Sequence, residues 1–163
     1  MADAKGARVI TPELLVVGVD FSLTSESAVD EALSLAAAPG ASVHLVNVAA
    51  GSATEIVLDL LEGARRTNPA EAERHLAGYG RSRAAAHGFP ADRIRAHVRV
   101  GNPAAEIVAV ARELGADLVV VGTHGRTGLG RMLIGSVAEA IVKRAHCPVL
   151  VSRARSHSAG VAA

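Results

Sequence analysis

The sequence predicts an α/β fold, a three-layer sandwich in which a five-stranded parallel sheet of order 3-2-1-4-5 carries helices on both faces. Three observations predict it. Short β-rich runs alternate with helical patterns along the chain. The runs at 14–19 and 118–121 are apolar throughout, as strands buried on both faces are. The run at 93–100 alternates apolar residues with arginine and histidine, which suits an edge strand.

Each element follows from its local pattern. The strands are expected at residues 14–20, 42–48, 93–100, 117–123 and 147–153. Apolar residues spaced three and four apart predict helices at residues 28–36, 54–65, 68–87, 103–114 and 136–145. Helix boundaries carry their own signals: Pro39-Gly40 ends the first helix, and Asn102-Pro103 begins the fourth.

The strand order follows from burial. The first and fourth strands are the most apolar and therefore belong in the middle. The third strand, with its arginines, and the fifth, which includes Pro148, belong at the edges. Right-handed crossovers leave the order 3-2-1-4-5. The first and fourth strands then flank the switch point, where ligands bind beyond the carboxyl ends of the strands.

The chain has 163 residues, which is the size of one domain. We expect a flexible N-terminus over residues 1–12, a single domain over residues 13–153, and a disordered tail over residues 154–163, which are small and polar.

Composition excludes several classes of protein. The net charge is +1 and aromatic residues are 2%, which argues against a nucleic-acid surface. No apolar run approaches the length of a membrane span, and the N-terminus lacks the apolar core of a signal peptide. A single cysteine, Cys147, cannot form an internal disulfide. We therefore expect a cytoplasmic protein with no nucleic-acid or membrane partner.

The predicted crevice has an acidic residue on one side, Asp20, and a glycine-rich stretch on the other. The glycines are Gly122, Gly125, Gly128, Gly130 and Gly135. This stretch leads into a helix, whose N-terminal N–H groups and partial positive charge attract anions. Glycines let the backbone approach a phosphate, and Arg126 and Arg131 add charge. The pattern predicts a phosphate-bearing ligand, without the Gly-Lys-Ser/Thr of a Walker loop.

Each of these features also has a purely structural interpretation. The glycines could form a plain connection. Ser136 and Glu139 fit a capping box, so that the hydroxyl would serve the helix alone. Asp20 could cap the turn that follows it. His124 is expected to be an exposed loop residue without a catalytic role, and Cys147 an inert, buried thiol.

The spacing Gly122-x2-Gly125-x9-Gly135-Ser136 resembles the nucleotide-binding motif of the universal stress protein family. The resemblance covers residues 13–153. It includes the segment 17–22, which looks like the family's first strand and aspartate, the Gly-Asn-Pro at 101–103, and the segments 116–125 and 146–151.

The resemblance implies that the ligand is ATP, with Mg2+ or Mn2+ bridging its phosphates. The residues it places around the nucleotide, none of them catalytic, are Gly18, Val19, Asp20, Val48, Gly122, Thr123, His124, Gly125, Arg126, Thr127, Gly128, Gly135, Ser136 and Val137. In this assignment Asp20 lines the adenosine pocket and the Val48 backbone holds adenine. Gly18 stands where a bulkier residue is common, which predicts a looser adenine end.

The resemblance also implies a two-fold dimer through the fifth strand. Its residues Val149, Leu150 and Val151 form an apolar edge without the charges of the third strand.

Two functions remain open: an ATP-binding stress-response regulator, and a slow Mg-dependent ATP hydrolase. Hydrolysis needs a base, and only Asp20 and His124 are near the motif, so regulation is favoured. Cyclic AMP or AMP could replace ATP in an interaction module. The sequence argues against four other classes: adenylating enzymes, receiver domains, flavodoxins and a nucleotide-free scaffold. An adenylating enzyme would carry a Ser-Gly-Gly-x-Asp-Ser loop, a receiver domain an aspartate that ends strand three, and a flavodoxin aromatics that stack on flavin, and the sequence lacks all three features. Its intact glycine motif argues against a nucleotide-free scaffold.

Overall fold

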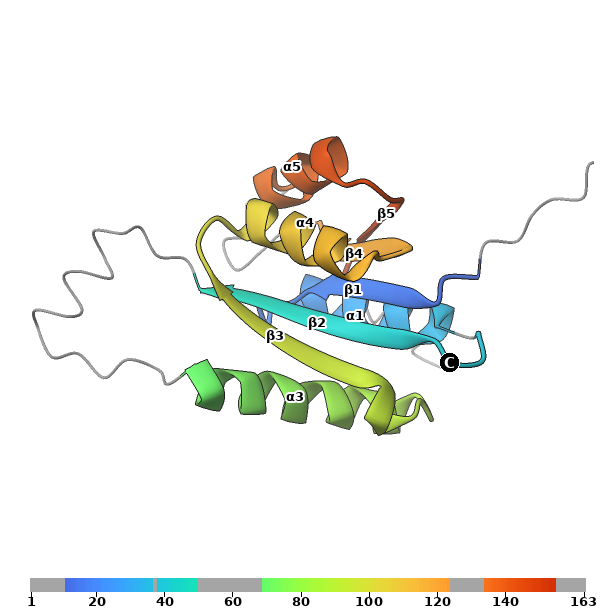
Figure 1. The fold of residues 1–163 in the computed structure, drawn as a ribbon. Coiled ribbons are helices and arrows are strands. Elements are labelled where there is room, and N and C mark those ends of the chain that lie inside the picture. The colour runs from blue at the N-terminus through green and yellow to red at the C-terminus, as the bar shows by residue number, and fades with distance from the viewer. Residues whose placement is uncertain (1–10, 37, 50–68, 124–133, 155–163) are drawn as a thin grey trace, which may run out of the picture.

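The computed structural model describes residues 11–36, 38–49, 69–123 and 134–154. It contains a parallel sheet of order β3-β2-β1-β4-β5, which confirms the predicted order (Figure 1). The strands are β1 (Leu14–Gly18), β2 (Ser42–Ala49), β3 (Ile94–Val100), β4 (Leu118–Gly122) and β5 (Val149–Ser152). The helices are α1 (Leu23–Leu35), α3 (Pro69–Ala86), α4 (Pro103–Leu114) and α5 (Ser136–Arg144), with a short 3-10 turn, η1, at Ala91–Arg93.

The helices cover both faces of the sheet, as predicted (Figure 1). On one face α1 and α3 bury a core that includes Leu15, Leu45 and Leu76. On the other, α4 and α5 bury a second core that includes Val110 and Ile141. In the described residues, no helix combines the length and the apolar character that crossing a bilayer requires. The helix expected at residues 54–65 lies outside the described residues.

Strands β1, β4 and β5 are shorter than expected. The strand β1 ends at Gly18, so that Asp20 belongs to the following turn rather than to the strand. Cys147 lies before β5 rather than in it and is half-buried. Partial burial raises the pKa of its thiol, in keeping with the expected inert role.

Two polar contacts fix the framework that carries the site. At the amino ends of the strands, the Asp117 carboxylate accepts hydrogen bonds from the backbone N–H groups of Glu13 (3.0 Å) and Leu14 (2.9 Å). On the α1 and α3 side, Asp30 pairs with Arg83 and with His87. Partial burial would raise the pKa of Asp30, but hydrogen bonds from Arg83 and His87 hold it below its usual value. The first contact joins β1 to β4, and the second joins α1 to α3.

The sheet face covered by α4 also carries a histidine pair. His44 of β2 and His97 of β3 have nearly parallel rings, and His44 Nδ1 lies 2.9 Å from His97 Nε2. Burial, together with the charges of His97 and Arg95, lowers the pKa of His44 to about 4. Burial also lowers the pKa of His97, with a contribution from Arg99. The register that pairs β2 with β3 therefore makes the predicted wet face of β3 only half exposed.

The histidine pair predicts acid-sensitive stability. Because folding lowers the pKa of His44 from 6.5 to about 4, the unfolded chain binds a proton more readily. The contribution of this pKa shift to the unfolding free energy is fully present above about pH 6.5 and is lost as the pH falls toward 4. His44→Gln should flatten this pH dependence of the unfolding free energy, measured by urea titration. The exposed His146→Gln should follow the wild type, and a His44→Gln curve parallel to the wild type would contradict the assignment.

Candidate functional site

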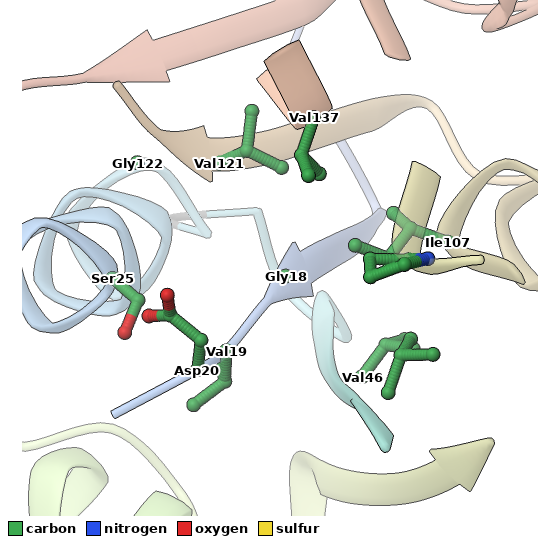
Figure 2. A pocket seen from close by; sticks show the side chains of 11 residues that line it. Gly18, Val19, Asp20, Ser25, Val46, Ile107, Val121, Gly122 and Val137 are labelled. Carbon is green, nitrogen blue, oxygen red and sulfur yellow. The ribbon is translucent and has the colours of Figure 1, made fainter. Parts of the chain in front are cut away.

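A cavity of about 150 Å³ lies at the carboxyl ends of the central strands β1 and β4 (Figure 2). This is the predicted switch point of the sheet. The cavity is bounded by the sheet and by the first turns of α1, α4 and α5. Its lining residues are Gly18, Val19, Asp20, Ser25, Val46, Val48, Pro103, Ile107, Val121, Gly122 and Val137.

The polar side of the cavity lies at the start of α1. Asp20 Oδ1 accepts hydrogen bonds from the Ser22 backbone N–H (3.0 Å) and hydroxyl (2.5 Å). Ser22 is the N-cap of α1 and accepts in turn from the Ser25 N–H at 3.3 Å. Among the described residues no hydrogen bond reaches Asp20 Oδ2. Asp20 therefore does cap the turn, as its structural interpretation predicted, and still presents one oxygen to the cavity.

The opposite side of the cavity is apolar. Figure 2 shows Asp20 and Ser25 on one side of Gly18, and Ile107, Val121 and Val137 on the other. An apolar cavity of about this volume is large enough to hold a benzene-sized ring. The cavity thus combines a compartment fit for an aromatic ring with a polar edge that carries a carboxylate.

Glycines end both central strands for reasons of space. A Cβ at residue 122 would lie 2.7 Å from Thr24 Oγ1 and 2.8 Å from the Thr24 carbonyl carbon. A Cβ at residue 18 would lie 2.9 Å from Ile107 Cδ1 and 3.1 Å from Val121 Cγ1. A Cβ at residue 18 would therefore press on the side chains of Ile107 and Val121, while the looser adenine end expected from Gly18 stays a prediction.

The start of α5 is joined to the end of β4. The Gly135 N–H donates to the Thr123 carbonyl at 2.6 Å, which brings together the two ends of the segment between them. Gly135 is the N-cap of α5, without a side-chain cap, and Ser136 is the first helical residue. Glu139 binds Lys143 at 2.6 Å instead of reaching back. The predicted capping box is therefore wrong, and the first N–H groups of α5 have no intrahelical partner.

Comparison with known proteins identifies the family. The model of the universal stress protein family matches residues 13–153. The chain belongs to this family. Universal stress protein YxiE of Bacillus subtilis is 32% identical over 148 residues, which is 85% of this chain and 97% of that protein. Other family members match over less of their own length: the alignments cover 35% of MJ0531 of Methanocaldococcus jannaschii and 45% of Rv2005c of Mycobacterium tuberculosis.

Solved universal stress proteins share the fold. The structure of MJ0577 is 26% identical with a TM-score of 0.74, and the match covers 90% of this chain and 99% of that chain. A universal stress protein solved in complex with cAMP is 27% identical with a TM-score of 0.66, covering 90% of this chain and 100% of that chain. The second of these relatives binds an adenine nucleotide.

The structure brings together several of the described residues that the family resemblance places around the nucleotide. Gly18, Val19, Asp20, Val48, Gly122 and Val137 all line the cavity. Thr123, Gly135 and Ser136 lie beside it at the junction of β4 and α5. The predicted phosphate residues His124, Gly125, Arg126, Thr127 and Gly128 lie outside the described residues.

The sequence prediction missed five lining residues, Ser25, Val46, Pro103, Ile107 and Val121. Four of these are apolar residues that had been assigned to strands or helix stripes. A buried wall of the cavity carries the same hydrophobic pattern as the core. Their positions in the chain could have indicated these five residues, because each lies toward the carboxyl end of a strand or in the first turns of a helix that follows a strand.

The two helix starts make different predictions for stability. Asn102 is the N-cap of α4, and its side chain accepts from the Ala105 N–H at 3.0 Å. Asn102→Ala should lower the unfolding free energy by about 1 kcal/mol. Ser136→Ala should change it by no more than a few tenths, because Ser136 caps nothing. Urea titration compares the two, and an equal loss in both variants would restore the capping box.

Proposed function

We propose that this universal stress protein binds ATP at the cavity and acts as a nucleotide-dependent regulator of the stress response. The observation that supports the proposal best is the cavity itself. It joins an apolar compartment fit for an aromatic ring to a carboxylate at the start of α1 and to the N-terminus of α5. Adenine would occupy the apolar side, with the phosphates directed toward α5 and the glycine motif.

A divalent cation fits this arrangement without a dedicated cage. Mg2+ is usually held by one or two carboxylates together with the phosphates of its ligand. Among the described residues that line the cavity, Asp20 is the one carboxylate, and its Oδ2 has no hydrogen bond. Mg2+ or Mn2+ bound to ATP would therefore find a single protein oxygen at Asp20.

Regulation is favoured over efficient hydrolysis. The lining residues of the described chain offer Asp20 as the only candidate base, and its Oδ1 is held by Ser22. A slow Mg-dependent hydrolase remains the second candidate for the same ligand. We also propose a cytoplasmic location, in keeping with a single cysteine that is half-buried.

Cyclic AMP or AMP is the alternative ligand. A relative with a TM-score of 0.66 was solved with cAMP, and the apolar compartment would hold the same base in each case. The ligand carried by the purified protein separates these candidates: denaturation followed by mass spectrometry identifies the nucleotide released.

Binding itself has a matched pair of tests on α5. Val137 lines the cavity, and Val142 on the same helix is exposed and does not line it. We expect micromolar affinity for ATP, roughly −8 kcal/mol by calorimetry. Val137→Phe should weaken it at least about tenfold by filling the compartment, a loss of about 1.4 kcal/mol. Val142→Phe should leave it unchanged. Equal affinities in all three proteins would place the nucleotide elsewhere, and no binding to wild type would contradict the proposal.

We further propose a homodimer through β5. This strand is an edge of the sheet in the described chain, and Val149, Leu150 and Val151 are only partly buried. An apolar edge without protecting charges is prone to pair with another chain.

The ladder geometry predicts opposite effects for two proline substitutions. The carbonyls of Pro148 and Ser152 accept from β4, so by alternation Leu150 also faces β4, whereas Val151 faces the open edge. Leu150→Pro should remove a hydrogen bond within the sheet and unfold the domain. Val151→Pro should leave a folded monomer. Circular dichroism and light scattering measure both properties, and a folded dimer of Val151→Pro would exclude this interface.

A further inference from the structure

The side chains at the apolar end of the cavity can recognise a ligand only by its shape. Among the described residues, the side chains around that end belong to Val46, Val48, Pro103, Ile107, Val121 and Val137. None of these side chains carries a hydrogen-bond donor or a polar acceptor. Hydrogen bonds to a ring at this end are therefore left to the backbone, and the side chains contribute the outline that the ring must fit.

Ile107 is a buried part of the wall at this apolar end. It lies one turn into α4 and is 5% exposed, packed in the core beneath the helix. The start of α4 is held by the Asn102 cap and by Pro103 in the first turn. Isoleucine is β-branched, and its first side-chain torsion is nearly fixed in a helix. The direction in which its side chain leaves the helix is thus set by the fold and not by the ligand.

Gly18 is complementary to Ile107. The φ of Gly18 is not positive, so the backbone conformation does not require glycine there. Space favours glycine, because a Cβ at residue 18 would lie 2.9 Å from Ile107 Cδ1 and the tip of that side chain would have to move. Ile107 also lines the cavity (Figure 2).

We propose that Ile107, with Gly18 as its complementary position, determines which ring this site accepts. The ligand class is a nucleotide whose adenine carries no substituent on the edge that meets α4. The contact at Ile107 Cδ1 rejects a ring that is larger there by a single methyl group. This proposal rests on the proposed function, since it assigns the specificity of the same site.

The first experiment tests the pair without any ligand. Ile107→Val deletes Cδ1, the atom nearest to a Cβ at residue 18. Gly18→Ala should lower the melting temperature of the nucleotide-free protein, and Gly18→Ala with Ile107→Val should recover most of that loss. Should Gly18→Ala fail to fold, recovery of the fold in the double variant is the readout. Losses that simply add would overturn the complementarity.

The second experiment tests specificity by calorimetry with ATP and with three analogues that carry one methyl group on adenine, at N6, C2 or C8. For at least one analogue, Ile107→Val should improve affinity relative to ATP by about tenfold or more, the usual effect of one methyl group in an apolar pocket. Ile141→Val is the matched control, because Ile141 is a buried isoleucine of the same core that does not line the cavity.

The outcomes separate the two proposals. Unchanged ratios for all three analogues, with ATP still bound, would overturn the role of Ile107 and leave the proposed function intact. The same gain in Ile141→Val would also overturn it, because the effect would then come from a softer core. A wild-type protein that binds no adenine nucleotide would remove the proposed function and this specificity with it, while the melting temperatures still decide whether the two residues are complementary.

Discussion

The site depends on two close approaches, each made possible by a glycine at the end of a central strand. At Gly122 the first turn of α1 packs on β4 through Thr24, with less than 3 Å available for a side chain. At Gly18 the side chain of Ile107 takes the equivalent space above β1. A larger residue at Gly122 would meet the Thr24 backbone and push α1 away from the sheet, whereas one at Gly18 would displace the tip of the Ile107 side chain. The cavity therefore lies where α1 and α4 pack closely against the ends of β4 and β1, because the glycines there carry no side chains.

These approaches also divide the cavity into two chemical halves. The helix α1 contributes Ser22 and Ser25, whose hydroxyls are held by the turn that contains Asp20. The helix α4 contributes Ile107, which is part of the apolar core. Because each half belongs to a different helix, its polarity follows from the role that helix already has in the fold. A polar cap is needed where α1 begins, and an apolar face where α4 meets the sheet.

Much of the architecture could be predicted because the composition of each strand indicates how deeply that strand is buried. The apolar runs of β1 and β4 placed them in the centre, and the arginines of β3 placed it at an edge. The motif also located Asp20, Val48 and Val137 at the cavity.

Features that depend on distances between elements could not be predicted in this way. The capping box failed because Ser136 fits the N-cap position in sequence, but the helix begins at Ser136 itself, one residue earlier than that pattern requires. Ile107 was assigned to a buried stripe, which is correct, yet its place in the cavity depends on how near α4 comes to Gly18. The contact between His44 and His97 similarly depends on the register of β2 against β3.

The division of the cavity bears on the choice among adenine nucleotides. ATP, AMP and cAMP share one base, so under the proposed function the apolar half at Ile107 would contribute nearly the same free energy to each. Discrimination among them must come from the polar half, where their charges differ. The N-terminus of α5 favours negative charge by about 0.3–1 kcal/mol at an exposed position, and it lies where β4 ends at Thr123. Asp20 acts in the opposite direction, since a bare carboxylate repels phosphate unless a cation lies between them. The more highly charged the ligand, the more its binding should depend on a divalent cation, which makes ATP the nucleotide for which Asp20 matters most.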